Sequence, residues 1–159
     1  MAYPKFFPGY LQVAAQFRLP PMMPRLDEAG WRHTGLDTAA AAMAAQLSQQ
    51  LEAQGLPLFD QMVVMPLDES ADRVQVAKKL FDSLPVGLSY FIIHPAQDTP
   101  ELRAIAPDWP SRVADYEAFT SEELRDYVKS SGLHVVGYRA LRDITRASAV
   151  FPPSRRATG

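Results

Sequence analysis

The hydrophobic residues of this chain recur at helical spacing in some segments and form short apolar runs in others. The helical spacing predicts helices over residues 7–17, 38–54, 70–84, 109–119, 122–131 and 138–144. The short runs predict strands over residues 61–65, 87–95 and 133–137, and at most a brief or edge-type strand over the proline-rich residues 19–24. The run over 87–95 is the strongest, and its continuous apolar character is typical of a strand buried on both faces.

Polar residues mark the ends and the outer faces of these predicted helices. Asp37 is a suitable N-cap for the second helix, and Gly55 is a suitable stop for it. The stripe of that helix expected to face the core comprises Ala40, Met43, Ala44, Leu47 and Leu51. The side chains of the third helix expected to face water are Arg73, Lys78, Lys79 and Asp82.

The order of the predicted elements is one helix followed by four rounds of a strand and a helix. This alternation indicates an α/β fold with mainly parallel strands. Two architectures fit it: a small doubly wound sheet, and a segment of a (β/α) barrel, which takes about 250 residues when complete. We expect a single α/β domain over residues 1–144. The residues 145–159 have no periodicity, and we expect a disordered tail there.

The composition narrows the classes of function. Sixteen basic and eighteen acidic residues give a net charge of −2, which argues against a nucleic-acid or polybasic membrane surface. The absence of cysteine excludes a disulfide framework, a thiolate nucleophile and Cys-ligated metal sites. No apolar stretch approaches the roughly 20 residues of a membrane span, and the N-terminal residues do not resemble a secretory signal. These features predict a cytoplasmic protein.

His94 is the strongest candidate for chemistry. It lies at the carboxyl end of the 87–95 strand, before a long loop, and ligands of α/β folds gather at such strand ends. An imidazole there can bind a metal or transfer protons, and the alternative is a hydrogen-bonded histidine that closes the strand. Asp98, in the loop, could orient His94 or bind a metal through water. The alternative for Asp98 is a solvated residue that caps the turn at Thr99-Pro100.

Arg112 begins the helix after this loop and could clamp a carboxylate or a phosphate. The commoner role for such an arginine is an ion pair, here with Asp115 or Glu117. Two further histidines are weaker candidates. His33 is expected to be a surface loop residue, and His134 is expected to be a satisfied or edge residue of the last strand.

Several motifs of catalysis and nucleotide binding are absent. The chain has no GxGxxG motif after a strand, no P-loop and no GxSxG elbow, so dinucleotide binding, NTP hydrolysis and serine-hydrolase chemistry lack support. No HExxH, HxxxH or HxxH pair is present, so the chain does not offer two imidazoles on one helix to a metal.

A set of short motifs indicates a family. These are Leu84-Pro85-Val86-Gly87, His94-Pro95, Arg112, Phe119-Thr120-Ser121-Glu122, and Gly132-Leu133 through Tyr138-Arg139. Taken together and in this order, they resemble the C-terminal part of the ChbG/YdjC-like carbohydrate deacetylases. The opening segment FFPGYLQVAAQFRLPPMMPR resembles the helix and strand that follow the central histidine motif of that family. The resemblance therefore extends over nearly the whole chain, to about Ile144.

The resemblance implies metal-dependent hydrolysis of the N-acetyl amide of an amino sugar, in an irregular (β/α) barrel related to NodB. It implies that His94 is a metal ligand and that the cofactor is a divalent metal, Mg or Zn. We take Asp98 and Arg112 as the catalytic candidates beside it. The family's other metal ligands come from an N-terminal Asp-Asp strand end and a central histidine motif, and neither is present in this sequence. We therefore expect a truncated or split family member that does not retain the metal alone.

Three hypotheses about function follow. The first is the C-terminal portion of a deacetylase that is inactive alone. The second is a non-catalytic sugar-binding or structural remnant of that family, and the third is a small flavodoxin-like binding domain. Because part of a barrel exposes strand edges and an apolar inner face, we expect a homodimer or association with a missing N-terminal half.

Overall fold

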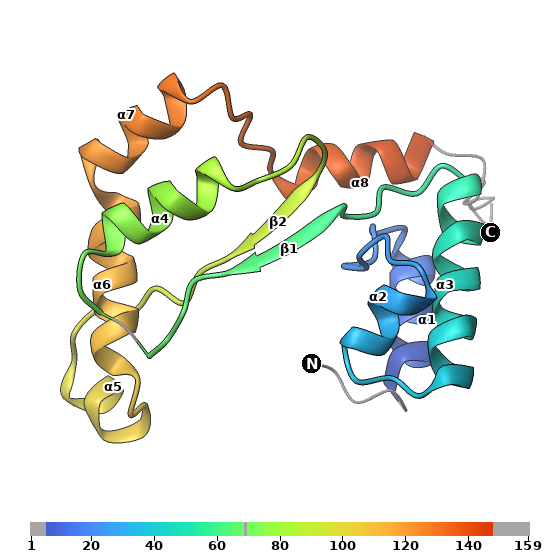
Figure 1. Ribbon diagram of the computed structural model, residues 1–159, viewed down its shortest axis with the longest axis horizontal. Coiled ribbons are helices and arrows are strands. Elements are labelled where there is room, and N and C mark those ends of the chain that lie inside the picture. The colour runs from blue at the N-terminus through green and yellow to red at the C-terminus, as the bar shows by residue number, and fades with distance from the viewer. Residues whose placement is uncertain (1–5, 69, 148–159) are drawn as a thin grey trace, which may run out of the picture. The chain divides into compact units, whose positions relative to one another are not determined.

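The structure is a computed structural model, and it describes residues 6–68 and 70–147. Contacts divide the chain into two compact units (Figure 1). We call them the helical unit, which is drawn from residues 1–60 and 136–159, and the sheet unit, which comprises Gln61–Val135. A single domain over residues 1–144 stays a prediction.

The described part of the helical unit contains α1 (Phe7–Phe17), α2 (Glu28–His33), α3 (Thr38–Ala53) and α8 (Tyr138–Ala147). Aspartate side chains cap the N-termini of α2 and α3. Asp27 accepts a hydrogen bond from the amide of Gly30 at 2.7 Å, and Asp37 accepts one from the amide of Ala40 at 2.8 Å. Gly55 follows α3 with a φ of 81°, a backbone conformation that favours glycine. The predicted cap and stop of this helix are therefore confirmed.

The core of the helical unit forms where α2 packs against α3. Its buried residues are Met23, Trp31, Ala41, Ala44, Ala45 and Leu58. The predicted stripe of α3 is wrong in part, because Met43 is 72% exposed and the fully buried Ala41 was not included. The small side chains at Ala41, Ala45 and Ser48 recur every three to four residues. Ala41 and Ala45 lie in one core cluster with Trp31 of α2, and Met43 lies off this buried face of α3.

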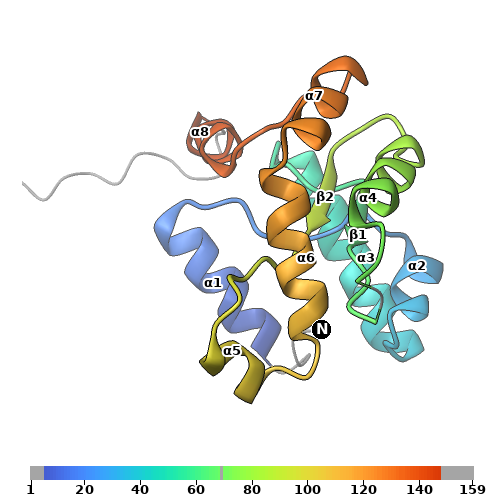
Figure 2. The same ribbon diagram turned by 90° about the vertical axis from the view of Figure 1, so that its left-hand side faces the viewer.

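The sheet unit contains β1 (Gln61–Val64), α4 (Arg73–Asp82), β2 (Ser89–Ile92), α5 (Pro100–Ile105), α6 (Trp109–Thr120) and α7 (Glu122–Ser130). The strands β1 and β2 pair in parallel, with Met62 opposite Tyr90 and Val63 opposite Phe91. The connection between them passes through α4, which lies beside both strands (Figures 1 and 2). The unit is thus a β-α-β element followed by three helices.

The core of the sheet unit lies between the strands and the helices α4, α6 and α7. Met65, Ala77 and Leu124 are buried there. Three phenylalanines pack around them: the ring centroids of Phe81 and Phe91 are 4.7 Å apart, and those of Phe91 and Phe119 are 5.9 Å apart. This packing fixes α6 against the end of β2, where His94 follows.

The structure confirms a mixed α/β protein with parallel strands, but not four strand–helix rounds or a NodB-like barrel. In residues 19–24 the only pairing described is one isolated bridge from Pro24 to Phe59. Residues 133–137 are irregular, and β2 is half-buried along its length, because in the described residues it has β1 as its one neighbour. Residues 145–147 belong to α8 and not to a tail, while 148–159 lie outside the described residues.

Candidate functional site

His94 lies two residues beyond β2, at the carboxyl end of the strand, as predicted. His94 is half-buried, and its backbone N–H donates a hydrogen bond to Oδ2 of Asp115 at 3.0 Å. Its Nδ1 is buried and has no hydrogen-bond partner among the described residues. A buried polar atom without a partner is uncommon in folded proteins, and it is expected where a ligand or a reacting group completes the site. Within the described residues, Nδ1 of His94 thus lacks the hydrogen bond that a satisfied strand-closing histidine would make.

Asp115 and Arg73 form a buried ion pair next to His94. Nε of Arg73 donates to Oδ1 of Asp115 at 2.9 Å, and Nη2 of Arg73 bonds the same oxygen. The side chain of Arg73 is 3% exposed and that of Asp115 is 0% exposed. Nη1 of Arg73 also donates to the carbonyl of Pro66 at 2.7 Å. The pair thus ties α4, α6 and the segment after β1 to the backbone of His94.

Sequence reasoning missed this pair, since it expected Arg73 to face water. The signal was present in the helical spacing. Arg73 lies one turn before the buried Ala77, and Asp115 lies between the buried Ser111 and Ala118 on one face of α6. A charged residue on the apolar stripe of each of two neighbouring helices indicates a buried pair.

Asp98 is engaged away from His94. Its two carboxylate oxygens accept hydrogen bonds from Nε and Nη2 of Arg103, each at 2.6 Å, and the guanidinium of Arg103 lies 4.5 Å from the ring centroid of Trp109. The hydrogen bond from Arg103 is the main cause that lowers the pKa of Asp98. Thr99, and not Asp98, caps α5 by accepting from the amide of Leu102. Among the described residues, Asp98 makes no hydrogen bond to His94.

Arg112 lies near His94, but its partner differs from the two that were predicted. Its Nε and Nη2 donate to the two oxygens of Asp108 at 2.8 and 2.9 Å, in the first turn of α6. This hydrogen bonding is the main cause that lowers the pKa of Asp108, and the charge of His94 contributes in the same direction. The carbonyl of Arg112 accepts from the amide of Ala96 at 3.1 Å. The structure therefore brings together His94, Asp108, Arg112 and Asp115.

The other two histidines are far less enclosed. His33 ends the short helix α2, where the sequence predicted a loop, and its exposed ring lies with Nδ1 3.1 Å from the carbonyl oxygen of Ala29. His134 is exposed in the irregular segment that was predicted to be the last strand. The weaker ranking of both residues agrees with their exposure.

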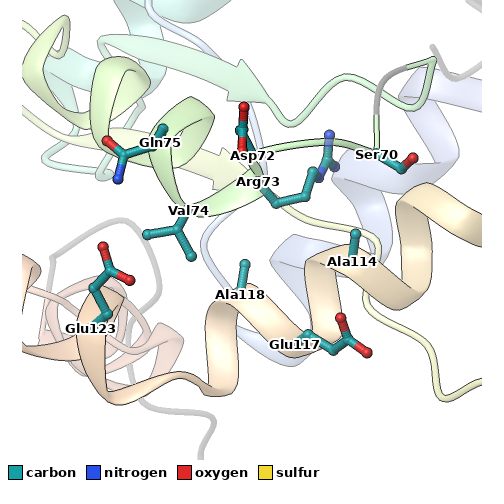
Figure 3. Close-up of a pocket in the computed structure, with 9 residues that line it drawn as sticks. All are labelled: Ser70, Asp72, Arg73, Val74, Gln75, Ala114, Glu117, Ala118 and Glu123. Carbon is teal, nitrogen blue, oxygen red and sulfur yellow. The ribbon is translucent and has the colours of Figure 1, made fainter.

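Two of the surface hollows formed by the described residues stand out, and neither is lined by His94, Asp98 or Arg112. One, of about 480 Å³, is lined by Ala29, Arg32, His33 and Leu36 in the helical unit. The other, of about 430 Å³, lies between α4, α6 and α7 in the sheet unit (Figure 3). Its lining combines the small apolar residues Val74, Ala114 and Ala118 with the acids Asp72, Glu117 and Glu123, the last of which is paired with Lys78 at 2.7 Å. Neither hollow is the expected catalytic cleft.

The described residues do not form a metal site by themselves. No group of three or more His, Asp or Glu side chains is arranged to hold an ion within residues 6–68 and 70–147. The unpartnered Nδ1 of His94 suits one ligand, but a catalytic cation is usually held by three protein ligands. Any remaining ligands would have to come from outside the described residues.

Comparison with known proteins identifies the family of the chain. Residues 1–130 match the family described as YdjC-like protein. The chain belongs to this family. A similar curated protein of Thermus thermophilus, named carbohydrate deacetylase, is 30% identical over 134 residues, which are 84% of this chain and 46% of that protein. The YdjC-like chain thus spans about half the length of this relative. In its described residues, no helix is long and apolar enough to cross a membrane.

Proposed function

We propose that this chain is the C-terminal portion of a carbohydrate deacetylase that hydrolyses the N-acetyl amide of an amino sugar. The observation that carries the proposal is His94, whose buried Nδ1 has no partner among the described residues at the carboxyl end of β2. In α/β folds this strand end is the place where ligands bind. The family match favours this function over a flavodoxin-like binding domain.

The chain's own residues suggest a division of roles. His94 presents an imidazole nitrogen to the reacting centre, where it can bind a ligand or transfer a proton. Arg112 and Asp98 stay catalytic candidates, but each is held by an ion pair, with Asp108 and Arg103 respectively. Each would have to release its partner to act on a substrate. Arg112 is better placed to do so because its backbone contacts the segment that follows His94.

We propose that a divalent cation, Mg or Zn, binds only when further metal ligands are supplied from outside the described residues. One imidazole is too small a donor set for a catalytic ion, since affinity depends on the number and geometry of ligands. We therefore expect the chain alone to retain no metal and to show no deacetylase activity. It is proposed to act in the cytoplasm, as a homodimer or with a polypeptide that supplies the N-terminal half.

The test joins the N-terminal portion of a relative to this chain. We define the fusion as the portion of the Thermus thermophilus relative that precedes the matched region, joined ahead of this chain. Acetate release from an N-acetylated amino sugar is measured with the fusion, the chain alone and the N-terminal portion alone, each with added Mg or Zn, and bound metal is quantified by elemental analysis. The proposal predicts metal and activity in the fusion alone. A folded fusion without activity would contradict it and would favour a non-catalytic sugar-binding remnant.

A further inference from the structure

Helix α6 holds the segment after β2 at two points. Oδ2 of Asp115 accepts from the backbone N–H of His94 at 3.0 Å. One turn earlier in the helix, the carbonyl of Arg112 accepts from the backbone N–H of Ala96 at 3.1 Å. Both donors belong to the main chain, so these contacts fix the backbone on either side of Pro95. They thereby fix the direction in which the Cα–Cβ bond of His94 points.

Asp115, which accepts from His94, is itself held by Arg73. One carboxylate oxygen, Oδ1, takes the guanidinium of Arg73, which leaves Oδ2 aimed at the amide of His94. The guanidinium is fixed in turn by the carbonyl of Pro66, at the end of the neighbouring strand. The side chains of Arg73 and Asp115 are almost completely buried, so water does not compete for these bonds. The orientation of the carboxylate is therefore set by α4 and by the chain after β1.

Stability alone is a poor explanation for such a pair. The desolvation of two charges costs about as much as their attraction returns, and well-packed apolar residues in the same place are often equally or more stabilising. What an apolar pair cannot do is accept a hydrogen bond from the amide of His94. Nδ1 of the imidazole has no hydrogen-bond partner among the described residues, so this nitrogen does not anchor the ring and the position of the backbone matters more.

We propose that Arg73 and Asp115 are positioning residues that set the place of the His94 imidazole in the site. This inference rests on the proposed function in so far as it gives His94 a substrate to act on. The pair acts through the amide of His94, and neither side chain touches the reacting atoms.

The first test measures amide hydrogen exchange by NMR in the full chain. The variant is Asp115→Asn, which keeps an oxygen in place but removes the charge that matches Arg73. The reference is the amide of Met65, which donates to the carbonyl of Ile92 at 2.9 Å and reports opening of the sheet. Because a hydrogen bond to a charged group contributes more than a neutral one, exchange at His94 is expected to speed up about tenfold or more relative to Met65.

A matched control separates positioning from loss of packing. Ser111 is a buried polar residue on the same helix, and its hydroxyl donates to the carbonyl of Leu67 at 2.9 Å. Ser111→Ala should leave the ratio of the two exchange rates as in the original chain. If Asp115→Asn accelerates His94 and Met65 equally, the pair has a structural role only, and the proposal is wrong. If Asp115→Asn does not fold, Arg73→Lys gives the same comparison, because lysine keeps the positive charge but lacks the planar guanidinium group.

The second test uses the fusion. Asp115→Asn is expected to lower kcat about 10- to 100-fold, the range seen when the supports of an active-site ligand are removed, with KM changed less than about twofold. Ser111→Ala should change neither constant. An unchanged kcat in Asp115→Asn would overturn the positioning role. An inactive parent fusion would count against the proposed function, while the exchange ratio of the chain itself would still decide whether Asp115 positions His94.

Discussion

The two units of this chain bury polar groups in different ways. In the helical unit the buried hydroxyls of Ser48 and Thr145 donate to the carbonyls of Ala44 and Leu141, four residues earlier in the same helix, at 2.9 Å each. In the sheet unit Arg73 and Asp115 are bonded across 42 positions of sequence and reach the backbone of a third segment. These local bonds each stay within one helix. The long-range network joins elements at one point, and that point is His94.

The largest expected effect is the loss of stability when the buried pair of Arg73 and Asp115 is broken. Arg73→Ala and Asp115→Ala should each lower the free energy of unfolding of the sheet unit by about 3–5 kcal/mol, because each leaves a buried charge without its partner. The chain has two tryptophans, Trp31 in the helical unit and Trp109 in the sheet unit. In a Trp31→Phe background, urea unfolding followed by fluorescence therefore reports the sheet unit.

A double variant sharpens this prediction. Arg73→Met with Asp115→Leu removes both charges and keeps apolar volume, so it should recover most of the lost stability. It should not restore the slow exchange of the His94 amide, because no acceptor is present. Equal loss of stability in the single and double variants would contradict the account of the pair as a positioning device.

The core of the helical unit should respond to size and not to charge. Ala41 is completely buried where α2 packs on α3, so Ala41→Leu is expected to cost about 1–3 kcal/mol through overpacking. Met43 is on the same helix but 72% exposed, and Met43→Ala should change stability by less than about 0.5 kcal/mol. Urea unfolding in a Trp109→Phe background follows Trp31 and measures both. A larger cost at Met43 would restore the stripe that the sequence predicted.

A smaller difference in stability is expected at the N-termini of two helices, one in each unit. Asp37 caps α3 through its side chain, and Asp37→Ala should cost about 1 kcal/mol. Asp72 precedes α4 with a φ of 48° and makes no side-chain cap bond. Asp72→Gly should therefore be neutral or slightly stabilising, since glycine adopts positive φ without strain. Thermal unfolding of the two variants compares these starts, and a loss at Asp72 that equals the loss at Asp37 would contradict the expectation.

The smallest effect concerns pH. The pKa values of Asp98 and Asp108 lie below their usual values because Arg103 and Arg112 hydrogen-bond the charged carboxylates. A carboxyl whose folded-state pKa is depressed adds stability above its unfolded value, about 3.9, and that addition is lost as the pH falls through the folded value. Carboxyl NMR titration should show both groups ionised below the ordinary range. Arg103→Ala should raise the pKa of Asp98 alone, and a parallel rise at Asp108 would show that the pairs are coupled.

The sequence predicts much of the local structure, because local signals decide it. The periodicity and caps place α1, α3, α6 and α7 within a residue or two at most ends, and the apolar run locates β2 and the histidine after it. Long-range pairing is not encoded in this way. Even the short-range ion pairs of Asp98 and Arg112, with Arg103 and Asp108, differ from the interactions expected, because the sequence alone does not decide between several charges that lie nearby. For the missed pair of Arg73 with Asp115, the helical spacing places each charge on a buried face, but which charges meet is decided only when the two helices pack together.

The central claim is that His94 is the residue of this chain on which deacetylation depends. The direct measurement is the rate of acetate release by the fusion carrying His94→Ala, beside the fusion carrying His134→Ala, whose imidazole is exposed in an irregular segment. The account predicts a loss of at least about 100-fold for His94→Ala, the scale expected when a group that acts at the reacting centre is removed, and a rate within about twofold of the parent for His134→Ala. Equal rates in the two variants would contradict it.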